Sequence, residues 1–163
     1  GPIAIRYPRG TAVGVELAET IKALPIGKAE QLTDGGDVVI LAIGRPVADA
    51  VKAAKRLAAD GIAATVVNCR FVKPLDKERI TSLVSKIPNV VTVEENVLQG
   101  GFGSAVIELL SDAGIRPDRL ERVGIPDEFV THGAADLLRS FYGLTAEGIE
   151  STVRRLPLSR GCR

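Results

Sequence analysis

Four short runs of residues typical of strands, separated by segments of helical periodicity, constrain the fold of this chain more than any other feature. The runs occupy residues 38–43, 63–67, 90–93 and 120–123, and the first of them is continuously apolar. A strand that is apolar on both sides is typical of a sheet covered by helices on both faces, and such sheets are mostly parallel. The alternation therefore predicts an α/β fold, with a mostly parallel sheet of about five strands and helices on both faces.

The segments between these runs carry apolar residues at helical spacing. Helices are expected over residues 47–58, 80–87, 106–110 and 137–141. Pro74 is expected to open the second of them, because the first turn of a helix does not use the N–H that proline lacks. Thr145 has the hydroxyl of an N-cap residue, and it precedes a last amphipathic segment.

A further strand is expected ahead of the first apolar run, near residues 26–32. The sequence Asp34-Gly35-Gly36 then signals a tight turn, which predicts a hairpin between this strand and residues 38–43. So short a strand suits the edge of a sheet. The sequence thus predicts one antiparallel edge strand on an otherwise parallel sheet.

Composition excludes several classes of function. The chain has 163 residues, of which 45% are hydrophobic and 25% charged, and its net charge is +1. No cluster of Lys and Arg predicts binding to nucleic acid, and no apolar run reaches the roughly 20 residues of a membrane span. Cys69 and Cys162 are too few for a disulfide framework, and Cys69 lies among apolar strand residues.

The chain contains no methionine and begins with Gly1-Pro2, directly before a strand-like pattern at residues 3–7. We therefore expect it to be a fragment of a longer protein. Residues 1–20 are interpreted as the end of a preceding domain and a linker, and residues 21–163 as one domain.

Residues 90–105 read as a buried strand, an acidic strand end, a glycine-rich turn and the start of an apolar helix. The turn, Gly100 to Ser104, could bind a phosphate through its N–H groups. It lacks the third glycine of a dinucleotide fingerprint, however, and it follows a late strand. The favoured interpretation is that its glycines allow the helix to pack closely on the sheet.

Three titratable side chains are candidates for chemistry. Glu94 and Glu95 end a strand, where α/β proteins place functional groups, but solvation or a cap on the following turn is the favoured interpretation. His132 is the only histidine, with Asp127 and Glu128 close in sequence as possible orienting partners. A loop histidine beside a glycine is more often a helix-entry residue, and the roles of all three side chains stay open.

Several ordered segments show a family resemblance. They are Tyr-Pro-Arg-Gly at residues 7–10, Arg-Phe-Val-Lys-Pro-Leu-Asp at 70–76, the 90–105 segment, and Gly-Ile-Pro-Asp at 124–127. In this order, across nearly the whole chain, they resemble the C-terminal domain of 1-deoxy-D-xylulose-5-phosphate synthases, thiamine-diphosphate enzymes of the transketolase class. The resemblance implies a homodimeric bacterial cytoplasmic or plastid enzyme that makes 1-deoxy-D-xylulose 5-phosphate and CO2 from pyruvate and glyceraldehyde 3-phosphate.

The resemblance also implies thiamine diphosphate and Mg²⁺ as cofactors of the full-length protein. Their family signature, Gly-Asp-Gly followed by Asn, is missing here, because Asp34-Gly35-Gly36 is a turn. We therefore expect this fragment to be a structural and dimerisation domain, without catalytic, cofactor or metal residues of its own. The remaining alternatives are the corresponding domain of a 2-oxoacid dehydrogenase β chain and a free-standing flavodoxin-like domain that binds a phosphate or nucleotide.

Arg9 is the one substrate-binding residue that the resemblance assigns. A planar guanidinium can hold two phosphate oxygens, although surface arginines are usually just solvated. In the family, the arginine of the Tyr-Pro-Arg-Gly segment contributes to the phosphate site of the acceptor substrate, and only Arg9 matches that position. Arg6 lies off the matched position, and its substitution is expected to have almost no effect on substrate binding.

Overall fold

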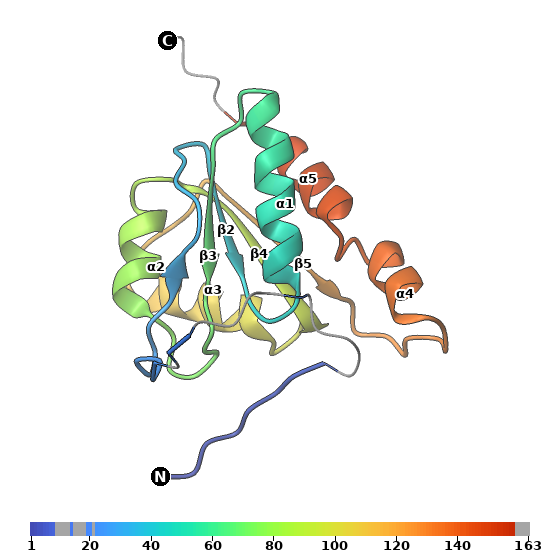
Figure 1. Cartoon of the computed structure of the whole chain (residues 1–163). Coiled ribbons are helices and arrows are strands. Elements are labelled where there is room, and N and C mark those ends of the chain that lie inside the picture. The colour runs from blue at the N-terminus through green and yellow to red at the C-terminus, as the bar shows by residue number, and fades with distance from the viewer. Residues whose placement is uncertain (9–13, 15–18, 21, 159–163) are drawn as a thin grey trace.

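The computed structural model describes residues 1–8, 14, 19–20 and 22–158. These residues form one five-stranded sheet flanked by helices (Figure 1). The strands are β1 (Glu30–Gln31), β2 (Val38–Ala42), β3 (Ala64–Asn68), β4 (Asn89–Val97) and β5 (Arg119–Ile125). The helices are α1 (Pro46–Ala59), α2 (Lys77–Val84), α3 (Phe102–Asp112), α4 (Ala135–Phe141) and α5 (Ala146–Arg154). The predicted α/β class, with a mostly parallel sheet, is confirmed.

The strand order is β1-β3-β2-β4-β5, and all pairs are parallel except β1 with β3. The antiparallel edge strand is therefore confirmed, but the predicted hairpin with residues 38–43 is wrong. Both edges of β2 are taken, by β3 and β4. The loop after β1 instead runs along β3, where Leu32 N donates to Val66 O at 2.8 Å and Gly35 N to Thr65 Oγ1 at 2.9 Å.

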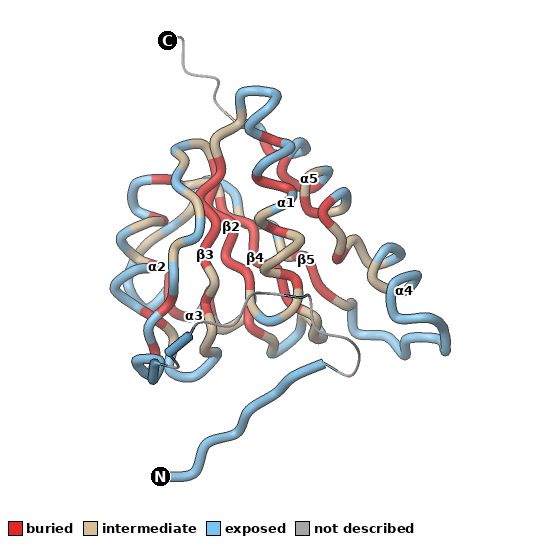
Figure 2. Tube along the Cα trace, viewed as in Figure 1, coloured by how far each residue is buried: buried red, intermediate tan, exposed pale blue. Residues whose placement is uncertain are grey.

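The core lies in two layers, one on each face of the sheet. On one face the buried residues of α1 and α5 pack against the strands, and on the other face those of α2 and α3 do. Figure 2 shows the buried residues concentrated along the central strands and on the inner sides of these helices. All five residues of β2 are buried, as a strand covered on both faces requires. None of the helices in the described part of the chain is long and apolar enough to cross a membrane.

Helices α2 and α5 each begin after an N-cap residue whose side chain accepts a hydrogen bond from the first turn. Thr145 caps α5 as predicted, and its hydroxyl accepts from Gly148 N. Pro74 does not open α2, however: the Lys73–Pro74 peptide is cis, and α2 begins after Asp76, whose carboxylate accepts from Arg79 N. An N-cap side chain satisfies a backbone N–H that the helix itself leaves unpaired. The Asp76 carboxylate can do this and proline cannot, so α2 begins after Asp76.

Two segments lie outside the packed layers. Residues 1–8 are exposed and form neither helix nor strand, so the strand pattern of residues 3–7 is not realised within this chain. Helix α4, which extends from the β5 side of the sheet in Figure 1, contains no buried residue. Phe129, Leu137 and Phe141 are large apolar side chains of this region and are exposed.

Candidate functional site at the carboxyl edge of the sheet

The glycine turn after β4 is closed by a carboxylate from β4 itself. Glu94 is fully buried, and its two carboxylate oxygens accept from Phe102 N at 2.6 Å and from Gly103 N at 2.7 Å. Asn96 Nδ2 donates to the same carboxylate at 3.2 Å. Of the two interpretations offered for Glu94, the cap is therefore right and solvation is wrong. The N–H groups that open α3 are occupied by Glu94.

The glycines of the turn are required by this close approach. A Cβ atom on Gly101 would lie 2.3 Å from Glu94 Oε2 and 2.4 Å from Val97 O. A Cβ on Gly103 would lie 2.7 Å from Thr92 Oγ1, a buried hydroxyl that has no hydrogen-bond partner in the described residues. The geometry agrees with the interpretation that these glycines bring the helix close to the sheet.

Glu95, the next residue, belongs to a different contact network. Its carboxylate accepts from Arg139 Nε of α4 at 2.5 Å, and Arg139 also bonds to Asp136 at 2.8 Å. Beside this pair lies an apolar hollow of 170 Å³, lined mainly by side chains of β5, α4 and the segments around them. Glu95 is therefore the residue that ties the carboxyl end of β4 to α4.

Arg6 also reaches this edge, although its segment is otherwise exposed. Its Nη2 donates to the main-chain oxygen of Glu95 at 3.1 Å, across 89 residues of sequence. No sequence pattern predicts this contact, since a local pattern does not connect two residues so far apart. Arg9, the predicted substrate residue, lies outside the described residues.

The histidine is not brought into a catalytic arrangement. His132 is exposed in the loop before α4, and it makes no hydrogen bond or ion pair with another described residue. Glu128, one possible orienting partner, accepts from Tyr142 instead, at 2.8 Å. Cys69 is also unsuited to chemistry, because burial raises the pKa of its thiol to about 12. Cys162 lies outside the described residues.

One residue with unusual backbone geometry was missed. Arg70, just beyond the carboxyl end of β3, has a φ of +56°, a left-handed conformation that residues other than glycine rarely adopt. Its guanidinium forms an ion pair with Glu30 of the edge strand, and its N–H donates to Asn68 Oδ1 at 3.2 Å. Strained residues of this kind cluster at functional sites. The sequence does not predict this conformation of Arg70, because arginine is not a residue type that favours a positive φ.

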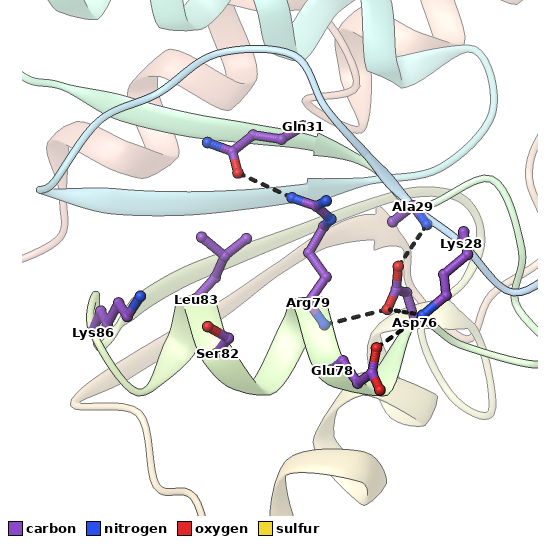
Figure 3. A pocket seen from close by; sticks show the side chains of 9 residues that line it. All are labelled: Lys28, Ala29, Gln31, Asp76, Glu78, Arg79, Ser82, Leu83 and Lys86. Carbon is purple, nitrogen blue, oxygen red and sulfur yellow. Dashed lines mark hydrogen bonds and ion pairs between the residues drawn. The ribbon is translucent and has the colours of Figure 1, made fainter.

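A larger hollow lies elsewhere, between β1 and α2 (Figure 3). This open groove of 690 Å³ is crossed by polar contacts. Lys28 Nζ lies 2.9 Å from Glu78 and 3.9 Å from Asp76, and Arg79 Nη1 donates to Gln31 Oε1 at 3.3 Å. Asp76 accepts from Ala29 N at 2.9 Å. These contacts hold the edge strand to α2. The charged side chains of the groove therefore already pair with one another, and they are the groups that would otherwise bind a charged ligand.

The described residues do not form a cluster that fits the Mg²⁺ ion that the resemblance implies. They contain no group of three His, Cys, Asp or Glu side chains that could hold a metal ion. The chain also lacks Gly-Asp-Gly. Within this part of the molecule, no set of side chains is therefore arranged to supply the oxygen ligands that Mg²⁺ prefers.

Comparison with known proteins places the chain in a defined group. A family model described as "Transketolase, C-terminal domain" matches residues 27–149. The chain is 54% identical over 156 residues to the 1-deoxy-D-xylulose-5-phosphate synthase of Heliobacterium modesticaldum, which covers 96% of this chain and 24% of that protein. With the corresponding synthase of Desulforudis audaxviator the identity is 52% over 152 residues, or 93% of this chain and 24% of that protein. The chain thus spans about a quarter of the length of these curated relatives.

Solved structures show the same architecture. A protein described as a split gene transketolase, inactive beta4 tetramer, matches with a TM-score of 0.74 and 39% identity, over 80% of this chain and 42% of that one. A transketolase from Pichia stipitis, solved with xylulose 5-phosphate, matches with a TM-score of 0.54 over 78% of this chain and 18% of that one. At 22% identity the second match shows the likeness of fold alone.

Proposed function

The chain belongs to the transketolase C-terminal domain family, as its motifs predicted, and on that premise we propose that it is the C-terminal domain of a 1-deoxy-D-xylulose-5-phosphate synthase. The observation that carries the proposal is identity above 50% to such synthases through nearly the whole chain. The full-length protein then condenses pyruvate with glyceraldehyde 3-phosphate and releases CO2 and 1-deoxy-D-xylulose 5-phosphate. It works as a homodimer in a bacterial cytoplasm or a plastid stroma.

Within that enzyme the domain has a structural role, in domain packing and dimerisation. Thiamine diphosphate, when bound to the full-length enzyme, supplies the ring that stabilises the carbanion left by decarboxylation of pyruvate. We infer that its ligands lie in the remaining three quarters of the protein, because this chain lacks the Gly-Asp-Gly segment of the family's cofactor signature. Residues 1–20 are the end of the preceding domain and the linker.

The turn after β4 disfavours the alternative of a free-standing phosphate-binding domain. A phosphate at a helix N-terminus needs free N–H groups, and those of Phe102 and Gly103 already donate to Glu94. A phosphate there would have to displace a buried carboxylate of the same charge. No observation favours a 2-oxoacid dehydrogenase β chain over a synthase.

Arg9 provides the test of the proposal. In the full-length enzyme, Arg9→Ala is expected to raise the KM for glyceraldehyde 3-phosphate by roughly ten- to a hundredfold, since a hydrogen bond to a charged group contributes about 1.5–3 kcal/mol. The KM for pyruvate, which has no phosphate, should change much less. Steady-state kinetics with each substrate varied in turn measures both values. An unchanged KM for the phosphate substrate removes Arg9 from the site, and equal losses for both substrates indicate a folding defect.

A further inference from the structure

Arg6 makes the single hydrogen bond that joins residues 1–8 to the rest of the described chain. Its guanidinium donates to Glu95 O at 3.1 Å. The neighbouring side chains gain little from this domain: Ile5 and Tyr7 are each 81% exposed. A hydrogen bond from a charged donor is among the stronger polar contacts. The position of this segment against the domain therefore depends on Arg6.

The acceptor of this bond lies on a well-held part of the molecule. Glu95 is a residue of β4, and its carboxylate is held by Arg139 of α4 at 2.5 Å. The preceding residue, Glu94, is fixed by the buried hydrogen bonds of the glycine turn. Both neighbours of the Glu95 carbonyl group are thus constrained, so the oxygen presents a defined anchor point.

The two sides of the segment face different surroundings. Figure 1 shows residues 1–8 as an extended stretch that leaves the domain. In an extended chain successive side chains point to opposite sides, so Ile3, Ile5 and Tyr7 share one side and Arg6 lies on the other. The Arg6 side meets this domain, while the apolar side lacks a partner within the described residues. This division is what a strand of a neighbouring domain requires when one polar side chain reaches across the boundary.

We propose that Arg6 is a positioning residue, whose bond to the Glu95 carbonyl oxygen sets the place of the Tyr-Pro-Arg-Gly segment against the carboxyl edge of this sheet. The proposal rests on the proposed function, in which Arg9 binds the substrate phosphate. Arg9 follows Arg6 by three residues, so the two Cα atoms lie within about 11 Å of each other whatever path the chain takes. A misplacement of about 1 Å can reduce the rate of an enzyme strongly. Arg6 therefore acts on phosphate recognition through Arg9.

The test uses the full-length enzyme with Arg6→Ala, Arg6→Lys, Arg9→Ala and the Arg6→Ala/Arg9→Ala double variant. Arg116→Ala, which removes an exposed arginine elsewhere, is the matched control. Arg6→Ala is expected to raise the KM for glyceraldehyde 3-phosphate about three- to tenfold, with kcat and the KM for pyruvate within about twofold. Arg6→Lys keeps a cationic donor and should recover most of the loss. In the Arg9→Ala background, Arg6→Ala should have almost no further effect, because it acts through Arg9.

The outcomes separate the two proposals. If Arg9→Ala raises the KM for the phosphate substrate and Arg6→Ala does not, the positioning role is overturned while the proposed function stands. Additive effects in the double variant also overturn it, since Arg6 then acts independently of Arg9. If Arg9→Ala leaves the KM unchanged, the proposed site fails and the positioning role fails with it. Should Arg6→Ala not fold, Arg6→Gln replaces it, and an unchanged KM in that variant, which keeps a donor, supports the role only if Arg6→Leu raises the KM.

Discussion

Glu94 is a buried carboxylate whose charge is compensated by N–H groups. Its oxygens accept from Phe102 N and Gly103 N, and no cation of the described chain lies within ion-pair distance. The start of α3 supplies those donors, and the positive end of a helix dipole favours a negative charge there. The acidic side chain and the glycine turn thus form one structural unit.

Glu94→Gln should lower the free energy of unfolding by about 2–3 kcal/mol, because hydrogen bonds to a charged group are the stronger ones and an amide can accept on only one of its two atoms. One of the two N–H groups is then left facing an NH2 group in the interior. Urea denaturation followed by circular dichroism measures the loss. Glu108→Gln, on the exposed side of α3, is the control and should change the value by less than about 0.5 kcal/mol. Equal effects of the two substitutions would contradict the cap.

Gly101→Ala tests the space at the turn. The added Cβ would lie 2.3 Å from the Glu94 carboxylate and 2.4 Å from a backbone oxygen, so the turn must move, at a cost of about 3 kcal/mol. Gly36→Ala is a matched control, since no atom lies within 4 Å of its built Cβ. That substitution should leave stability within about 1 kcal/mol of the original, through its effect on the unfolded chain. Thermal unfolding of both variants measures the change in stability. A Gly101→Ala variant as stable as the original chain would show that the turn is not tightly packed.

Helix α2 and the edge strand β1 are joined through Asp76. The carboxylate caps the helix at Arg79 N and accepts from Ala29 N, just before β1. Burial by itself raises the pKa of Asp76, but the hydrogen bonds from Ala29 N and Arg79 N, with the nearby Lys28 and Arg79 charges, outweigh it and lower the pKa below its usual value. The ionised form therefore stabilises the folded state.

The sign of the pH dependence follows from that direction. A carboxyl group with a lowered folded pKa contributes stability above its unfolded pKa of about 3.9, and the contribution is lost as the pH falls through the folded value. Asp76→Asn keeps a capping oxygen but cannot titrate, so its stability should fall less than that of the original chain between pH 5 and the acid range below pH 4. Asp76→Ala should lose about 2 kcal/mol already at pH 7.

Chemical denaturation at several pH values measures these changes. Asp118→Asn, which alters an exposed carboxylate, should follow the original chain at every pH. Parallel curves for Asp76→Asn and the original chain would show that Asp76 contributes nothing to the acid sensitivity.

As a whole, the molecule is a sheet between two helical layers, with its charged contacts at the surface and at the carboxyl edge. The interior of the described part is apolar, apart from a few buried side chains such as Glu94 and Thr92. Such a domain gains its stability from burial rather than from a cofactor.

Calorimetry of this chain with Mg²⁺ and thiamine diphosphate should detect no binding. The described residues lack a cluster of metal-binding side chains, and the sequence lacks Gly-Asp-Gly. The full-length protein is the positive control, in which binding is expected. A micromolar dissociation constant for this chain, equivalent to about −8 kcal/mol, would contradict the expectation and require a site that the present contacts do not reveal.

The sequence by itself determined the class of the fold and most of its elements. Buried parallel strands are apolar on both sides, and helices repeat their apolar residues with a period close to 3.6, so both patterns are local and can be read without tertiary information. The edge strand was predicted from the short segment before the turn signal at residues 34–36. The N-cap at Thr145 and the role of the glycines in close packing were predicted from residue type. The family followed from ordered motifs rather than from physical chemistry.

Only the tertiary structure decided which segments meet. The edge strand pairs with β3 because both edges of β2 are occupied, a fact that the turn signal at Asp34 does not contain. Glu94 is a buried cap and Glu95 a surface anchor, although the two are adjacent and identical in type, because alternate residues of a strand face opposite sides. The contact of Arg6 with Glu95 spans 89 residues. Contacts of this kind depend on chain topology, which brings distant residues together and leaves no mark on the local sequence around either of them.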